Sequence, residues 1–88
     1  MILIGYGRWR RKPTKESIAQ ASKLFEQFAK EGGKIIGQYW TLGKYDVTTI
    51  IEAKDEKAAM KFLLRWGDIL SLETATAIPR EEAIKLLE

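Results

Sequence analysis

Several hydroxyl and carboxyl side chains stand at alternate positions, with some apolar residues between them, along two consecutive β-type runs, residues 34–42 and 45–53. Successive side chains of a strand point to opposite faces, so these groups share one face of a sheet. Asp46 is the candidate general base there and Tyr39 the candidate donor, so the chemistry open to the cluster is proton transfer or hydrogen bonding to a polar ligand. The whole set is Tyr39, Thr41, Asp46, Thr48 and Glu52.

Structural roles for the same side chains stay open. Asp46 can cap the turn between the two runs, Tyr39 can pack between two copies of the chain, and Glu52 can be a surface charge at a strand end. The ligand-binding candidates are Tyr39, Thr41, Asp46, Thr48 and Arg8, and the catalytic candidates among them are Asp46 and Tyr39.

Positive charge gathers near the N-terminus. Residues 1–15 hold five cations and no acid, a net charge of +5, whereas the remainder has 10 basic and 12 acidic residues. Such a segment can bind phosphates, with Trp9 stacking on a base. Residues 45–50, however, lack the aromatic and glycine pattern of an RNA-stacking strand and bring an acid, so nucleic acid is not expected as a partner. Two interpretations of Arg8–Lys15 remain, a solvated basic loop and a mouth for an anionic ligand.

Cysteine and histidine are both absent from the 88 residues. This excludes thiolate nucleophiles, disulfides, Cys-based zinc sites and the usual general base. The carboxylates Asp46, Glu52 and Asp55 show no metal-ligand spacing, and we expect neither a metal nor a cofactor. No apolar run is long enough to span a bilayer, and residues 1–5 are too few for a signal-peptide core. We therefore expect one cytoplasmic domain over residues 1–88, with no membrane partner.

Two segments, residues 15–30 and 55–66, have the apolar spacing of amphipathic helices. Small polar residues precede them as caps and glycines follow them as stops. The expected signals are Thr14 or Ser17 and Gly32-Gly33 for the first helix, Asp55 and Gly67 for the second, and Pro79 ahead of a short terminal helix.

Residues 2–9, 34–42, 45–53 and 69–78 have the composition of strands. Gly5 and Gly7 weaken the first and can mark a bulge or a close backbone approach. A two-residue turn at Gly43-Lys44 would fix the register of the central hairpin. The pairs expected under the helices are then Leu42–Tyr45, Trp40–Val47, Gln38–Thr49 and Ile36–Ile51, and those on the other face are Thr41–Asp46, Tyr39–Thr48, Gly37–Ile50 and Ile35–Glu52.

The element order is thus βαββαβ with a short helix after it. Right-handed crossovers place both main helices on one face of a four-stranded antiparallel sheet, which is the ferredoxin-like α+β fold. The other face would carry Ile35, Tyr39 and Ile50 uncovered. Because exposed apolar patches mark contact sites, we expect a second copy to cover it, sheet against sheet.

The segment 39–46, followed by Ile51-Glu52-Ala53 and Asp55, resembles the GYD domain family, whose Gly-x-Tyr-Asp hairpin is here Gly43, Tyr45 and Asp46. The resemblance runs from about Gly33 to Thr76, including the Thr-x-Thr of Thr74 and Thr76, and it is weaker in the N-terminal third. It implies a ferredoxin-like fold that pairs into a dimeric α/β barrel, but no particular reaction. The amino-acid-sensing domain of feast/famine-type transcription regulators carries a similar hairpin and is the nearest alternative.

Taken together, these patterns and the resemblance to the GYD family predict a small homodimer, or a higher oligomer, with a small anionic or polar ligand in a cleft on the open sheet face. One alternative is a small dimeric-barrel enzyme that uses Asp46 as base with Tyr39 or Arg8 assisting. Amino-acid sensing is the other alternative. The absence of histidine and cysteine favours binding over catalysis.

Overall fold

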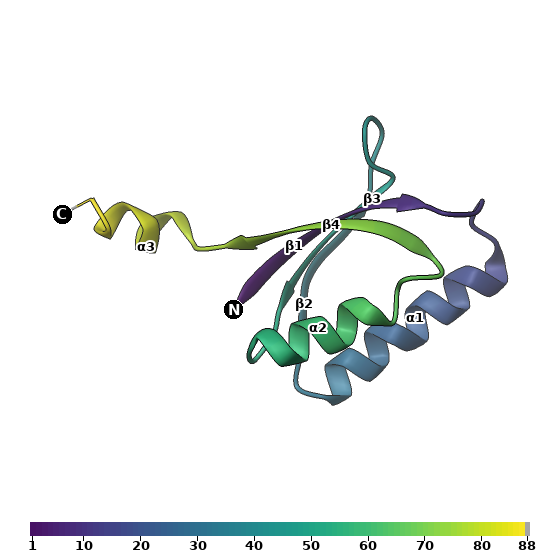
Figure 1. The fold of residues 1–88 in the computed structure, drawn as a ribbon, viewed down its shortest axis with the longest axis horizontal. Coiled ribbons are helices and arrows are strands. Elements are labelled where there is room, and N and C mark those ends of the chain that lie inside the picture. The colour runs from purple at the N-terminus through teal and green to yellow at the C-terminus, as the bar shows by residue number, and fades with distance from the viewer. Residues whose placement is uncertain (88) are drawn as a thin grey trace.

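A computed structural model describes residues 1–87 of the chain. Four strands and three helices follow one another in the predicted order (Figure 1). Their bounds are β1 Ile2–Trp9, α1 Lys15–Lys30, β2 Lys34–Trp40, β3 Val47–Glu52, α2 Glu56–Leu64, β4 Leu70–Ala77 and α3 Arg80–Lys85.

The strands form one antiparallel sheet in the order β2-β3-β1-β4, so β1 and β3 are central and β2 and β4 are the edges. Helices α1 and α2 lie together on one face, and no helix covers the other (Figure 1). This is the ferredoxin-like α+β fold, as predicted. Among the described residues, no helix is long and apolar enough to cross a membrane.

Helix α1 is held by side chains at its start and by glycines beyond its end. Thr14 is the N-cap, and it forms a capping box with Ser17. At the other end the two glycines have different roles. Gly32 has φ +96°, the left-handed conformation that ends helices, whereas a Cβ at Gly33 would overlap the ring of Phe28.

Helix α2 begins where predicted and ends two residues early. The Asp55 carboxylate accepts a hydrogen bond from the Ala58 N–H at 2.9 Å, as an N-cap does. The helix stops at Leu64, and Trp66 therefore lies in the turn that leads into β4. From this turn the indole of Trp66 enters the core and is only 4% exposed.

The central hairpin was predicted too tight. Its strands end at Trp40 and resume at Val47, so a six-residue loop replaces the two-residue turn. Side chains hold this loop: the Thr41 hydroxyl donates to the Tyr45 carbonyl at 2.7 Å. The predicted pairs between Trp40–Val47 and Gly37–Ile50 are confirmed. The predicted pair of Leu42 with Tyr45 is wrong, because Leu42 is fully exposed at the loop.

A β-bulge at Ile36 changes the start of β2. The register shifts between Ile35 and Gly37, so Ile35 pairs with Ile51 and not with Glu52. Ile35 consequently packs against the core, and Ile36 is 52% exposed. The prediction that Ile35 lies on the open face and Ile36 under the helices is wrong, because one extra residue reverses the face of every side chain before it.

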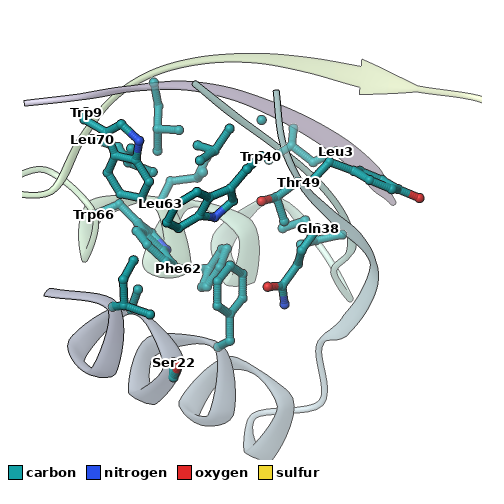
Figure 2. Close-up of a pocket in the computed structure, with 18 residues that line it drawn as sticks. Leu3, Trp9, Ser22, Gln38, Trp40, Thr49, Phe62, Leu63, Trp66 and Leu70 are labelled. Atoms are coloured by element: carbon teal, nitrogen blue, oxygen red, sulfur yellow. The ribbon is translucent and has the colours of Figure 1, made fainter. Parts of the chain in front are cut away.

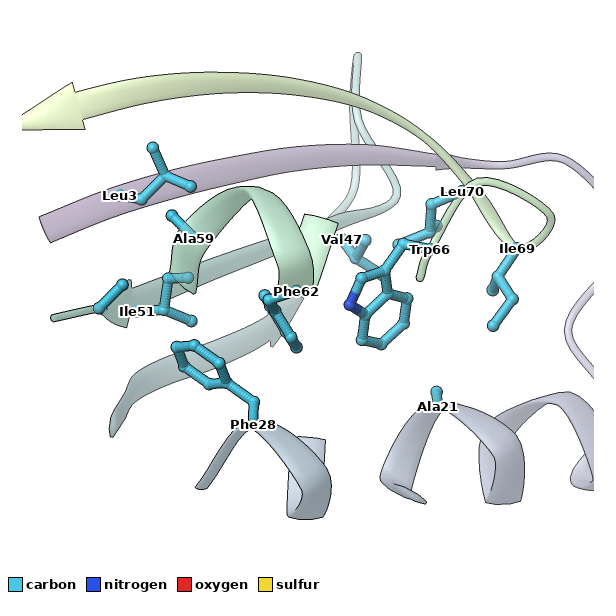
Figure 3. Packing of buried hydrophobic residues seen from close by; sticks show 11 residues of the cluster. Leu3, Ala21, Phe28, Val47, Ile51, Ala59, Phe62, Trp66, Ile69 and Leu70 are labelled. Carbon is cyan, nitrogen blue, oxygen red and sulfur yellow. The ribbon is translucent and has the colours of Figure 1, made fainter. Parts of the chain in front are cut away.

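The core between sheet and helices is rich in aromatic rings (Figure 3). Phe28 of α1 and Phe62 of α2 have ring centroids 4.3 Å apart, and Trp66 meets Phe62 edge-on at 5.7 Å. Leu3 and Ile51, from the two central strands, close this cluster on the sheet side. Such contacts join α1, α2 and the sheet into one packed unit.

Candidate functional site

A cavity of about 130 Å³ lies between the sheet and the helices (Figure 2). Its wall takes side chains from both central strands, from β2 and β4, from α1, and from α2 with the turn after it. The predicted cleft was placed on the opposite, open face of the sheet. A well-formed apolar hollow with a few polar groups is the default place to look for a ligand, and this hollow fits that description.

All three tryptophans of the chain line this cavity. Trp9 and Trp40 meet edge to face, with ring centroids 5.3 Å apart. Trp66 is buried opposite them, 4.9 Å from the ring of Phe25. Trp40 is 66% exposed and so belongs to the mouth of the cavity, while Trp66 belongs to its interior.

The hollow exists because small residues stand where large ones would fill it. Gly5, on β1, faces the helices and lines the cavity. A Cβ built there would meet nothing closer than the Thr49 carbonyl oxygen at 3.8 Å. Across the gap, α1 presents Ala21 and Ser22. The sequence signal was the row Leu3, Gly5, Gly7 and Trp9 on one side of the first strand, which we interpreted as a weakened strand with a bulge or a close backbone approach and not as a cavity.

Three uncharged polar side chains reach this wall: Ser22, Gln38 and Thr49. Within the described residues, none of them hydrogen-bonds to another protein group. Gln38 and Thr49 are cross-strand neighbours, and Figure 2 shows both beside the aromatic rings. No carboxylate, ammonium or guanidinium group belongs to the lining. The site is therefore neutral, with a free amide and free hydroxyls.

Only Tyr39 of the predicted site residues borders this cavity. Tyr39 pairs across the strands with Thr48, which pairs with Tyr6, and the side chains of these three residues belong to the open face. There the ring of Tyr39 lies against Gly37. Thr48 and Arg8 are on that face too. The prediction that these residues bind a ligand stays a prediction about the open face.

Asp46 ties the hairpin loop to β1. Its Oδ2 accepts a hydrogen bond from the Trp9 N–H at 2.8 Å, and its own N–H donates to the Gly7 carbonyl at 2.8 Å. Thr41 donates its N–H to the Asp46 carbonyl at 2.8 Å, which closes the loop. Asp46 thus has a structural role, but its carboxylate binds β1 and not the turn that the sequence analysis expected it to cap.

Tyr45 lies on the open face, contrary to the prediction that placed it under the helices. Its hydroxyl donates to Glu73 Oε2 on β4 at 2.6 Å, and its ring lies 5.2 Å from that of Tyr6. The Arg8 guanidinium lies 5.3 Å above the same ring, and its Nε donates to the Lys44 carbonyl at 2.9 Å. The family's Gly-x-Tyr-Asp hairpin thus fastens the loop to β1 and β4.

A charged cluster joins the end of α1 to α2. Arg65 donates from both Nη atoms to the Glu31 carboxylate, at 2.7 and 3.0 Å, and Lys61 lies 2.6 Å from it. The hydrogen bonds from Arg65, then those from Lys61, lower the pKa of Glu31 from 4.5 to about 2. Glu31 in turn raises the pKa of Arg65. Beside this cluster lies a second hollow of about 190 Å³, whose lining includes none of the tryptophans of the first.

The fold and its aromatic cavity define a ferredoxin-like α+β domain with a neutral hollow between sheet and helices. The chain belongs to the GYD domain family, whose profile matches residues 2–87. The family resemblance predicted from residues 33–76 is therefore confirmed, and it extends over nearly the whole chain. No curated protein matches the sequence.

Several solved structures share the fold, among them the following two. One is 5-chloro-2-hydroxyhydroquinone dehydrochlorinase (TftG) from Burkholderia phenoliruptrix AC1100, in complex with 2,5-dihydroxybenzoquinone. It has 14% sequence identity and a TM-score of 0.64, and the match covers 93% of this chain and 98% of that one. The other is TTHA0845 from Thermus thermophilus, with 20% identity and a TM-score of 0.52, over 90% and 98%. At these identities the likeness concerns the fold alone.

Proposed function

We propose that this domain binds one small, neutral, single-ring aromatic molecule in the cavity between its sheet and helices. The observation that carries the proposal is the wall itself, three tryptophans around a hollow with a free amide and free hydroxyls. Flat rings pack edge-on or offset against indoles, and a few polar groups fix their orientation. The absence of charge in the wall selects against ions, because a buried charge without a partner is costly.

The size of the cavity supports a one-ring ligand. Its volume of about 130 Å³ is close to that of engineered apolar cavities of ~150 Å³ that bind benzene. A two-ring ligand would have to displace wall residues or extend through the mouth beside Trp40. TftG offers a precedent for ligand size, since its structure holds 2,5-dihydroxybenzoquinone, which has one ring.

Binding is favoured over the two alternatives by the chemistry of the wall. A dimeric-barrel enzyme would need an acid or base at the ligand, and Tyr39 is the only ionisable residue of the lining. An amino-acid sensor would need partners for an ammonium and a carboxylate, and the lining has none. An anionic ligand would find cations only outside this cavity, near Arg8.

We also propose that the domain works as a homodimer that covers the open sheet face. Ile4, Tyr6 and Ile50 lie on that face and are each only partly buried in the single chain. The chain exposes 6723 Å², about 1,400 Å² more than the ~5,300 Å² expected for a compact monomer of 10.1 kDa. A standard interface takes about 800 Å² from each partner, so the excess is enough for one.

The ligand proposal can be tested with fluorinated rings of one size and different charge. We would titrate the protein into 4-fluorophenol, 4-fluorobenzoate and 4-fluorobenzylamine and follow ¹⁹F line widths. We expect the neutral phenol to bind and the two ions to bind at least about tenfold more weakly, a difference of about 1.4 kcal/mol. Failure of 4-fluorophenol to bind at millimolar concentration would sink the proposal.

A variant that fills the cavity localises the binding. Gly5→Leu adds a side chain that points into the hollow, where a Cβ has ordinary room. Ala29→Leu adds the same group on an exposed position of α1 and is the matched control. We expect Gly5→Leu to abolish phenol binding and Ala29→Leu to leave it unchanged. Equal binding by both variants would place the ligand elsewhere.

A further inference from the structure

The chain ends in a segment that leaves the body of the domain. Residues 78–87, which we call the C-terminal arm, include α3 and project beyond the sheet, away from α1 and α2 (Figure 1). The domain is 49 Å long in this direction and 17 Å thick. Its Cα radius of gyration is 14.0 Å, against about 12 Å for a compact chain of 88 residues.

Among the described residues, 1–87, the arm has no hydrogen-bonding or ionic partner in the body of the domain. The backbone hydrogen bonds from residues 82, 83, 86 and 87 all end on carbonyls of the arm itself. Within the described residues, no side-chain hydrogen bond or ion pair links the arm to the body. Pro79 has φ −54° and ψ 143°, an extended conformation that carries the chain onward from β4 instead of turning it back.

The arm exposes several large apolar side chains to water, which is unfavourable for a segment without a packing partner. Its large apolar side chains are exposed, with fractions of 58% for Ile78, 43% for Ile84, 75% for Leu86 and 87% for Leu87. Helix α3 has six residues, and helices shorter than about 12 residues are marginal in water without packing. Four of the six residues of α3 are charged, so its stability depends on another surface that covers Ile84 and the flanking Ile78, Leu86 and Leu87.

We infer that the C-terminal arm docks on a second copy of the chain, so that two copies exchange arms. A second copy is the occupant because the whole chain exposes about 1,400 Å² more than a compact monomer of its size, which exceeds the roughly 800 Å² that a standard interface takes from each partner, and a second copy offers the same uncovered sheet face. A two-fold dimer uses each arm once and closes the assembly. The inference rests on the proposed homodimer and adds to it a named element of the interface.

The test compares two pairs of substitutions in the full chain. Ile84→Glu with Leu87→Glu places charges on the arm, and Met60→Glu with Leu64→Glu places them on exposed positions of α2, as the matched control. Sedimentation equilibrium gives the dimer dissociation constant of each. We expect the arm variant to weaken the dimer at least about tenfold and the control variant to leave it unchanged.

The outcomes separate the two proposals. A wild-type chain that sediments at 10.1 kDa at ten micromolar would end both the homodimer and the arm exchange. A wild-type dimer that the arm variant leaves as tight as the control does would end the arm exchange alone, and the sheet face would then carry the interface.

A photo-crosslinker placed on the arm tests the contact directly. With p-benzoylphenylalanine at position 84, irradiation should give a covalent dimer, and digestion should recover arm peptides joined to peptides of the body. Mixing ¹⁵N-labelled and unlabelled chains before irradiation shows whether the joined peptides come from different copies. Joined peptides from the same copy only would overturn the inference.

Discussion

Gly5 and Gly7 lie two residues apart on the same face of β1, yet the structure predicts opposite results for the same substitution. At Gly5 a Cβ would meet only the Thr49 oxygen at 3.8 Å and a Leu72 methyl at 3.9 Å, which are ordinary contacts. At Gly7 it would lie 2.8 Å from the Val47 Cγ2 and 3.2 Å from a Leu70 methyl. The first site borders the cavity, and the second is where β1 is packed tightly.

The magnitudes follow from two opposing effects. Alanine is favoured over glycine within a strand by about 0.5–1 kcal/mol, and Gly5→Ala should raise the free energy of unfolding by that amount. At Gly7 the same gain is opposed by overpacking, which costs about 1–3 kcal/mol when a methyl group is forced into a filled core. Gly7→Ala should therefore be less stable than Gly5→Ala by about 1–3 kcal/mol, or roughly 4–24 °C in Tm.

Urea unfolding followed by tryptophan fluorescence, at one fixed protein concentration, measures both variants. The overpacking argument also predicts coupling: Gly7→Ala should cost less in a Val47→Ala background, because the methyl group that it meets is gone. Equal stability of the two alanine variants, or no coupling with Val47, would refute the reasoning.

Two further predictions concern side-chain contacts outside the cavity. The folded pKa of Glu31 lies near 2, below its ordinary 4.5, so its contribution to stability is complete above about pH 4.5 and is lost as the pH falls toward 2. Glu31→Gln should flatten the fall in unfolding free energy over that range, measured by urea titration at several pH values, and an unchanged profile would contradict this. Asp46→Ala should cost about 1–3 kcal/mol because the Trp9 N–H loses its acceptor, whereas Asp46→Asn keeps an acceptor oxygen and should cost less. Equal losses in thermal unfolding would assign the effect to the charge of Asp46 instead.

Periodicity and caps were enough to predict the fold. The helical spacing of residues 15–30 and the Asp55 cap located both main helices, because these signals act within one or two turns of chain. The hairpin was harder, because its loop is held from a distance: Asp46 bonds to Trp9, 37 residues away. A local rule for two-residue turns has no access to that contact, and it placed the strand ends two residues too far.

The bulge at Ile36 marks the position at which the alternation of side chains along β2 no longer predicts which face of the sheet each side chain occupies. Ile35 and Ile36 are the same residue type, so hydrophobicity cannot choose which one turns toward the helices. The pairing with β3 decides, and one extra residue in β2 reverses the assignment before the bulge while leaving Gln38 and Trp40 in place. The assignment of Tyr39 and Ile50 to the open face therefore rests on the correct strand pairing, whereas the assignment of Ile35 to that face rests on a wrong one.

The cavity escaped the sequence analysis because we searched for groups that do chemistry, and this cavity depends on side chains that are missing. Gly5 provides the space by lacking a side chain, and Trp9, Trp40 and Trp66 surround that space from β1, from β2 and from the turn after α2. Neither the space beside Gly5 nor the position of the three tryptophans around it can be predicted from one segment of the sequence. A glycine on the helix-facing side of a central strand removes packing and weakens the strand, so its presence is costly unless the space is used. If Gly5 serves a ligand, filling the space should raise stability and abolish binding together, whereas a merely tolerated defect would give the first effect without the second.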